Sequence, residues 1–391
     1  MSISNIKVKV TPLKTELEYG DEIDITDYVL ANTIGSVDEK IDSGNYDIGL
    51  YTYADLTITL ANYDGRFNDD TYSSSIFYYT RDRALIVVEF YDTNNTTVAL
   101  FKGLVNDEAT TQDFNKDIVK LKVLSRDSIL RKTNVPGGLI NNGSTISSAI
   151  SKILNRSNIT NVLNYDNNLI TVGIDSIIDD ASVFSDTDTR STLEKLLNAS
   201  GSVFRINNND TMVVSSRDPN IKPNLELFGG GNLLQENNIV NIDKFNDGLQ
   251  RTFNSFVVNE NVVKDDNFIN RYGSNIKTYD FKFITSTNTS SVIAEYLLNQ
   301  FKDPKNELEV TIPIDLSNNL EMLDPVVISF IKKTIGYNGN RVPIAGIAIA
   351  GKDLVPYSSN GIIIFSSKKW KIIGIKKDTK NFLATLRLRE I

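Results

Sequence analysis

Short runs in which apolar and polar residues alternate dominate the first third of this 391-residue chain. The pattern occurs at residues 6–10, 56–60 and 119–123. Because successive side chains of a strand point to opposite faces, this period of two predicts half-buried strands. Residues 84–91 are continuously β-branched, apolar or aromatic except for one glutamate, which favours a strand covered on both faces. With Asp, Asn and Gly turns between them, these strands predict a β-sandwich or small barrel over residues 1–133.

A second β-rich module is predicted over residues 241–391. A helix near 290–302 interrupts it, with Thr289 or Ser290 as the cap and Asp303-Pro304 as the stop. Arg271-Tyr272-Gly273 is interpreted as a turn. The strands are predicted at residues 253–259, 307–314, 325–331, 361–365, 370–375 and 382–388. A barrel is the simplest closure for this module as well.

The segment between the two modules, residues 134–240, is predicted to be a small α+β connector. Leu193, Leu196 and Leu197 lie on one face of a helix near 188–200, which Asp186, Asp188 or Thr189 can cap and Gly201 can end. The predicted hairpin 202–216 follows, and another helix is predicted near 145–155. Gly229-Gly230-Gly231 lacks the Lys-Ser/Thr of a phosphate-binding loop and is interpreted as a flexible linker. The fold class is therefore mainly β with an α+β insert.

The composition excludes several kinds of chemistry. The chain has no histidine and no cysteine, which removes the usual zinc sites, thiol catalysis, the Ser-His-Asp triad and disulfides. Its net charge is −8, without a stripe of Lys and Arg, which argues against a general nucleic-acid or anionic-membrane binder. The N-terminus resembles no signal peptide, and no run is long enough to span a membrane. We expect synthesis and assembly in a cytoplasm, and we assign no catalytic residue, cofactor or metal.

Two groups of carboxylates were weighed as sites. Asp64, Asp69 and Asp70 follow a strand, but their spacing does not match the alternating ligands of a calcium loop. The segment 62–67 instead predicts a tight turn at Gly65 with Phe67 in the core. Glycoside cleavage needs two carboxyl groups about 5–10 Å apart. Asp64 with Asp69 and Glu307 with Glu309 are nominal pairs, but alternation places Glu307 and Glu309 together on a solvent face.

The aromatic residues Tyr72, Phe77, Tyr78 and Tyr79 leave two interpretations open. Exposed rings could stack on sugars in a receptor-binding protein. The alternative, which we favour, is an interface or core loop over residues 73–79. Neither interpretation requires catalysis by this chain.

A series of short motifs follows the chain in a fixed order. They are residues 24–29, 54–62 and 64–67, then 192–201, and finally 271–273, 294–298, 323–328, 370–375 and 386–391. In this order they resemble the baseplate or tail hub proteins of tailed bacteriophages and related injection systems, and the resemblance spans nearly the whole chain. Where members of that family usually have Gly-Asp before a late strand, this chain has Leu323-Asp324-Pro325.

This resemblance implies two barrel-like domains separated by a helix-plus-hairpin domain. It implies a homotrimer whose barrels form a pseudo-sixfold ring in the virion. The expected partners are the tail tube or distal tail ring above and a tip, spike or fibre protein below. A tape-measure protein or transiting DNA would pass through the channel without sequence-specific binding. The alternatives are a hexameric distal tail ring protein and a tail-tip protein that binds or cleaves glycans.

Overall fold

The computed structural model describes the chain except residues 1–5, 31–33, 35, 41–48, 51–53, 70, 92–96, 217–224, 230–237, 247–251, 318–319, 333–361 and 379–380. The chain divides into two compact units. Unit 1 comprises residues 1–217, 253–302 and 378–381, and unit 2 comprises residues 218–252, 303–377 and 382–391.

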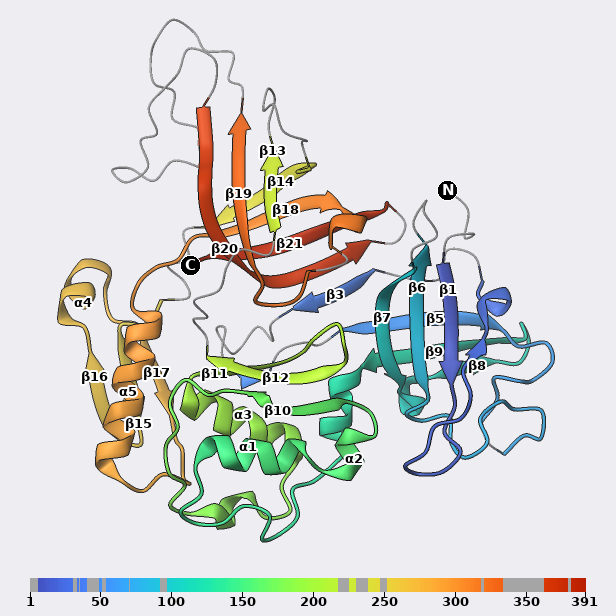
Figure 1. Ribbon diagram of the computed structural model, residues 1–391, viewed down its shortest axis with the longest axis horizontal. Coiled ribbons are helices and arrows are strands. Elements are labelled where there is room, and N and C mark those ends of the chain that lie inside the picture. Colours follow the sequence, from blue (N-terminus) through green and yellow to red (C-terminus); the bar gives the residue numbers. More distant parts are fainter. Residues whose placement is uncertain are drawn as a thin grey trace, which may run out of the picture. The chain divides into compact units, whose positions relative to one another are not determined.

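A seven-stranded sheet at the start of unit 1 contains all four predicted strands, as β1, β5, β6 and β9, and three strands that were not predicted, β2, β7 and β8 (Figure 1). Its order is β2-β1-β6-β7-β9-β5, with β8 paired to β9. A bridge between Val29 and Leu60 ties the chain after β2 to β5, so the two ends of this path are joined. The strands are β1 (Ile6–Thr11), β2 (Ile23–Asp24), β5 (Asp55–Ala61), β6 (Leu85–Tyr91), β7 (Thr97–Val105), β8 (Thr111–Asp113) and β9 (Ile118–Ser125). The strand β3 (Val37–Lys40) belongs to the same unit.

The insert of unit 1 combines helices with a four-stranded sheet of order β10-β12-β11-β4. In Figure 1 the helices α1 and α3 lie on one face of this sheet. The hairpin pairs antiparallel, whereas β10 and β4 add parallel strands to it. The elements are β4 (Gly49–Leu50), α1 (Ile146–Leu154), α2 (Ser157–Thr160), β10 (Asn164–Ile170), α3 (Thr189–Ser200), β11 (Ser202–Ile206) and β12 (Thr211–Ser216).

Local sequence explains why α3 begins and ends where it does. The Asp188 carboxylate accepts a 2.7 Å hydrogen bond from the Ser191 amide, which satisfies one of the free donors of the first turn. Gly201 ends the helix at φ 60°, in the left-handed region that glycine enters without steric cost. A β-carbon there would also overlap the Tyr296 ring. The predicted helices at 145–155 and 188–200 and the hairpin are confirmed.

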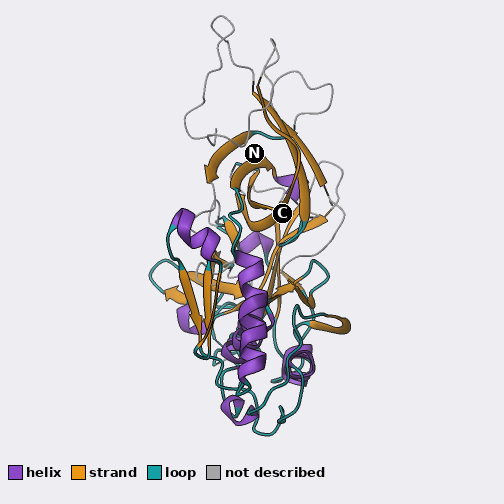
Figure 2. Ribbon diagram, turned by 90° about the vertical axis from the view of Figure 1, so that its left-hand side faces the viewer, coloured by secondary structure: helices purple, strands orange, loops and turns teal. Residues whose placement is uncertain are grey.

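The last part of unit 1 packs a long helix on a small sheet. The sheet has the order β16-β15-β17, and α5 lies beside it in the foreground of Figure 2. Phe256 and Val258 of β15 join Ile293 and Leu297 of α5 in one buried core that extends to α1 and α3. The elements are β15 (Ser255–Val258), β16 (Asn261–Lys264), α4 (Asp266–Tyr272), β17 (Ile276–Tyr279) and α5 (Thr287–Phe301).

Two local predictions in this segment are wrong. Arg271 and Tyr272 lie in the last turn of α4 and not in a free turn, because Asp265 caps a short helix by accepting from the Phe268 amide. The helix α5 begins at Thr287, ahead of the predicted caps, because the Ser286 hydroxyl accepts from the Thr289 amide. The polar first turn of α5 carries no apolar period, so the sequence pattern starts too late.

Unit 2 is built on a sheet that includes β13-β19-β20-β21-β18-β14 in this order. Gly229 ends β13 and is not a linker residue, because β13 pairs with β19, while Gly230 and Gly231 lie outside the described residues. Leu323 precedes β19 at φ 70°, in the conformation that glycine favours. The strands are β13 (Leu225–Gly229), β14 (Asn241–Asn246), β18 (Glu307–Pro313), β19 (Pro325–Lys332), β20 (Ile362–Asp378) and β21 (Leu383–Glu390).

A buried ion pair joins the first sheet to the insert within unit 1. Arg190 of α3 donates to the Asp127 carboxylate at 2.9 Å, and both side chains are nearly inaccessible. Burial raises the pKa of Asp127, while Arg190 and the Ser125 hydroxyl act in the opposite direction. At the tip of the hairpin, Asp210 pairs with Lys102 at 2.8 Å and with Arg126 at 3.2 Å. The fold class is confirmed, and the domain ranges 1–133, 134–240 and 241–391 stay predictions.

Candidate assembly surface

Three loops converge at one end of the first sheet. Register places Ala61 opposite Ile118 and Asp113 opposite Ile118, so β5, β8 and β9 reach this end together. The amide of Asn62 donates to the carbonyl of Asp117, which fixes the turn between β8 and β9 beside the loop after β5. The long loop from β5 to β6, residues 62–84, therefore begins at a rigid sheet edge. We call this region, residues 27–28, 62–69, 71–84 and 113–117, the sheet end.

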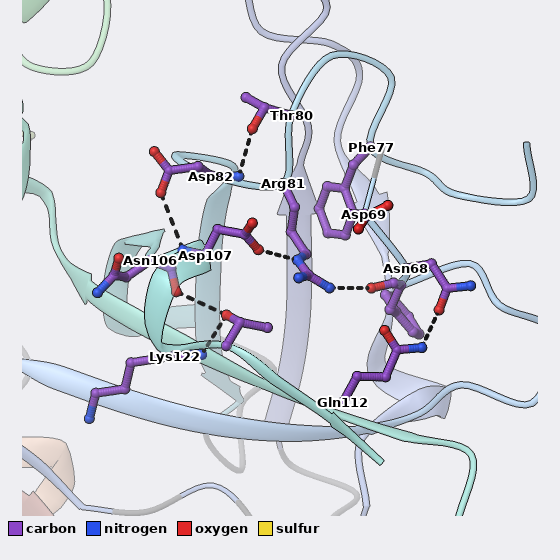
Figure 3. Close-up of polar contacts among 12 residues, drawn as sticks. Asn68, Asp69, Phe77, Thr80, Arg81, Asp82, Asn106, Asp107, Gln112 and Lys122 are labelled. Carbon is purple, nitrogen blue, oxygen red and sulfur yellow. Dashed lines mark hydrogen bonds and ion pairs between the residues drawn. The ribbon is translucent and has the colours of Figure 1, made fainter. Parts of the chain in front are cut away.

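Buried amide side chains hold the first half of the long loop. Asn62 and Asn68 are almost fully buried, and the Asn62 amide nitrogen donates to the Asn68 side-chain oxygen at 2.7 Å. Gln112 of β8 donates to the same oxygen at 2.5 Å, as Figure 3 shows. The Phe67 amide donates to the Asn62 side chain at 2.9 Å. These bonds satisfy polar groups of the turn that burial would otherwise destabilise, and Phe67 lies in the core as predicted.

An arginine holds the second half of the loop. Figure 3 shows Arg81 pointing inward between the Asp107 carboxylate and the backbone near Asn68. Its guanidinium donates to Asp107 at 2.5 Å and to the carbonyl of Phe67 at 3.1 Å. The Arg81 side chain thus connects its own end of the loop with Phe67 near the other end and with Asp107 in the turn after β7. The bonds to a charged group are stronger than neutral ones, so the loop is well fixed.

The loop that these contacts order exposes its aromatic rings. Phe77 is buried, but Tyr63 and Tyr78 are 70% and 69% exposed, and Tyr72 and Tyr79 are also exposed. Phe114, in the turn after β8, is 67% exposed. Among the residues whose exposure the structure describes, five of the six exposed aromatic side chains lie at this sheet end, Tyr272 being the sixth. Exposed aromatic side chains are enriched at protein interaction sites.

Tyr63 is held by neighbouring side chains rather than free to rotate. Its ring stacks on Tyr28 with centroids 5.8 Å apart, and Phe67 meets Tyr28 edge-on at 5.3 Å. The Arg66 guanidinium lies 4.3 Å from the Tyr28 centroid and pairs with Asp64 at 2.6 Å. The neighbouring Tyr63 hydroxyl raises the pKa of Tyr28. Ordered aromatic rings beside an arginine lose little entropy on binding, as in protein interface hot spots.

The acidic residues at this end serve the turn. Asp64 pairs with Arg66, and Asp69 accepts hydrogen bonds from the amide and hydroxyl of Thr71, so the structure uses them as local acceptors. Asp70 lies outside the described residues. Within the described residues, no cluster of three or more carboxylates is arranged to hold a metal ion.

The second carboxylate pair lies on β18 in unit 2. Leu308 and Val310 are buried, and Glu307 and Glu309 point to the other face and are half-buried. Glu309 lies opposite Arg387 of β21, and their charged atoms are 3.6 Å apart. A cross-strand ion pair gives Glu309 a structural role.

No helix in the described part of the chain has the length and apolar character needed to cross a membrane.

Similarity to known proteins is found at the level of structure. No protein-family model and no curated protein matches the chain. It is similar to the crystal structure of the tail protein from Neisseria meningitidis MC58, with a TM-score of 0.55 and 12% identity over 99% of this chain and 96% of that one. It is also similar to the 43 kDa tail protein of prophage MuSo2 from Shewanella oneidensis, with a TM-score of 0.53 and 14% identity, over 98% and 97%. The resemblance to tail hub proteins is thus confirmed as a shared fold.

Sequence reasoning found part of this surface and missed the rest. It named Tyr72, Tyr78 and Tyr79 as rings that could stack on sugars and placed Tyr78 and Tyr79 in an interface or core loop over residues 73–79, but it did not identify Tyr63 or Phe114. Both lie in turns next to Asp or Asn, outside the alternating apolar pattern of any strand. That local signal, an aromatic residue inside a turn sequence, could have indicated them.

Proposed function

We propose that this chain is a structural hub protein of a phage tail or baseplate, or of a phage-like particle. The observation that carries the proposal is a structural match to the Neisseria meningitidis tail protein and to the prophage MuSo2 tail protein over nearly the full length of all three chains. Two sheet modules in one chain support it further, because three copies then supply six similar modules. Such a ring can match a trimeric tip to a hexameric tube.

In this proposal the hub works by symmetric assembly and not by catalysis. The trimer joins the tail tube or distal tail ring to the tip, spike or fibre protein and lines the channel for genome ejection. A chain with net charge −8 supports a lumen that repels phosphates and so does not retain passing DNA. The assembled protein would reside in the virion.

The number of subunits tests the proposal directly. Mass photometry of the purified protein and electron-microscopic images of its rings should give three copies with pseudo-sixfold features. A ring of six equivalent copies would support the distal tail ring protein instead. A single copy per particle, or turnover of peptidoglycan or capsule by the pure protein, would contradict the hub role.

A further inference from the structure

The exposed apolar side chains of the sheet end are all of one kind. In the part of this end that the structure describes, every large apolar side chain that is exposed is aromatic: Tyr63, Tyr72, Tyr78, Tyr79 and Phe114. Elsewhere in the described chain the exposed large apolar side chains are aliphatic, with the single exception of Tyr272. The sheet end therefore offers flat rings to a ligand, without exposed branched aliphatic groups between them.

Acidic and hydroxyl side chains accompany these rings. Asp27, Asp64 and Asp117 are exposed, and so are Ser73 and Ser74 of the long loop. Aspartate and serine are depleted at protein–protein interfaces, which makes a second protein the less suitable occupant. A ligand rich in hydroxyl groups can instead donate to the carboxylates and exchange hydrogen bonds with the serine hydroxyls.

Hydrogen bonds fix the three segments that carry the rings. The Ser74 hydroxyl donates to the Gly65 carbonyl at 3.3 Å, so the middle of the long loop lies against its start. The Asn62 amide donates to the Asp117 carbonyl at 2.6 Å, which holds the turn between β8 and β9 beside the same start. The exposed rings are thus presented from segments that are bonded to one another, on the end of a sheet.

Tyr63 is the best-supported ring of this group. Its ring stacks on Tyr28 with an interplanar angle of 22°, and the residue is nevertheless 70% exposed, so the opposite face of the ring is open to solvent. Arg66 lies over Tyr28 and pairs with Asp64, which holds the supporting ring in place. A ring fixed in this way can stack on the apolar face of a sugar ring with little loss of side-chain entropy.

Charge limits the kind of sugar polymer that fits. The sheet end contains six aspartates and four basic residues, a formal net charge of −2. Of these basic residues only Lys116 is exposed, and it lies 3.6 Å from the Asp113 carboxylate. Negative charge repels polymers that carry phosphate or carboxylate groups, whereas a neutral glycan meets no such repulsion.

We propose that the sheet end binds a neutral glycan, with the open face of Tyr63 stacking on a sugar ring and the exposed carboxylates accepting from sugar hydroxyl groups. This inference goes beyond the hub role, because it adds recognition of a sugar polymer to a chain that works by assembly. It requires no catalysis and does not depend on the number of copies in a ring.

A microarray of neutral and anionic oligosaccharides, including N-acetylchitohexaose, maltoheptaose and hexagalacturonate, tests the proposal with the 391-residue protein. We expect binding to neutral oligosaccharides and none to hexagalacturonate. Isothermal titration calorimetry with the neutral oligosaccharide that binds most strongly should then show an affinity at least about tenfold lower for Tyr63→Ser. Tyr63→Phe keeps the ring and should retain most of the affinity. Tyr272→Ser removes the exposed ring on α4 and should bind like the wild type.

Three results would overturn the inference. They are the absence of binding to every neutral oligosaccharide, a preference for the anionic ones, and equal affinity of Tyr63→Ser and the wild type. Thermal unfolding of Tyr63→Ser close to the wild-type temperature excludes loss of folding as the cause of weaker binding.

Mass photometry of the same variants separates this inference from the proposed function. If Tyr63→Ser weakens assembly and no neutral oligosaccharide binds, the sheet end is a protein contact and the glycan inference is wrong. A wild-type protein that binds a neutral oligosaccharide but remains a monomer at every concentration supports this inference and contradicts the hub role.

Discussion

The insert and the sheet end, both in unit 1, are stabilised by different interactions, apolar burial in the first and polar hydrogen bonds in the second. The insert buries apolar side chains of α1, α3 and α5 in one core, and its ion pair with the first sheet is nearly inaccessible. The sheet end instead orders its loop with amide and guanidinium hydrogen bonds around the buried Phe67 and Phe77, and it leaves five aromatic rings in solvent. The comparison shows that polar bonds can fix a loop while its apolar side chains remain available.

This difference predicts which substitutions change the stability of the fold and which change only its association with other molecules. Apolar burial dominates folding, so substitutions in the insert should lower the free energy of unfolding. Aromatic rings that are already solvent-exposed contribute little to folding and can contribute much to association. Four substitutions test the comparison, in order of decreasing effect on stability.

Arg190→Met should have the largest effect. It leaves the Asp127 carboxylate buried without its cation, which typically costs about 3–5 kcal/mol. Because burial raises the pKa of Asp127 above its ordinary value of 3.8, this carboxyl stabilises the fold below that value and loses its contribution as pH rises through the raised pKa. The destabilisation, measured by urea unfolding, should therefore be larger at pH 7 than at pH 4.

The double variant Arg190→Met with Asp127→Asn is the control for this prediction. It removes both charges and should recover part of the lost stability at neutral pH. An equal loss in the single and double variants would contradict the idea that an uncompensated carboxylate causes the effect.

Arg81→Met should cost less, about 1–3 kcal/mol. Its partner Asp107 is 36% exposed, so water can replace the guanidinium when it is removed. The loop at residues 62–84 should become more sensitive to limited proteolysis, because two of its anchoring bonds are lost. Arg83→Met is a matched control, because it removes an arginine from the same loop whose Nε lies 3.9 Å from the Asp82 carboxylate, too far for a hydrogen bond. Equal proteolysis of both variants would show that Arg81 does not order the loop.

Asp179→Asn should cost about 1 kcal/mol at neutral pH. Hydrogen bonds from the amides of Thr285 and Ser286 hold the pKa of Asp179 below its ordinary value of 3.8. The carboxylate therefore stabilises the fold above that value, and the contribution is lost as pH falls through the lowered pKa. The difference in unfolding free energy between wild type and variant should shrink progressively as pH falls below about 3.8 through the lowered pKa. A constant difference down to pH 2.5 would contradict this explanation.

Tyr63→Ser should have the smallest effect, within about 0.5 kcal/mol, because the side chain is mostly exposed. Its stacking on Tyr28 should be lost without a change in the buried Phe67. Differential scanning calorimetry measures the effect on stability. A loss above about 2 kcal/mol would mean that the ring is part of the folding core and would remove the contrast between the two regions.

Much of the fold could be predicted from the sequence because its signals are local. Alternation located β1, β5 and β9, and a continuous apolar run located β6, whereas β2, β7 and β8 were not predicted. The leucine period with Asp188 and Gly201 located α3 within a residue at each end. The helix α4 was missed because a helix of seven residues has too few turns to show a period. The start of α5 was placed too late, since its first turn is polar.

The candidate site was less predictable because its contacts join distant residues. Gln112 meets Asn68 across 44 positions, and Arg81 meets Asp107 across 26. Asparagine, glutamine and arginine in a loop carry no periodic signal, and their burial depends on how three loops pack at a sheet end. The tyrosines at residues 72–79 were noticed by composition alone, whereas their exposure needed the structure.

The sequence by itself determined the local elements, since strand alternation, helix caps and glycine conformations depend on neighbouring residues. Only the tertiary structure decided that α5 shares a core with α1 and α3, that Leu323 adopts a glycine-like conformation, and that five aromatic rings gather on one surface. Such features arise from packing between segments far apart in the chain, which local patterns do not encode.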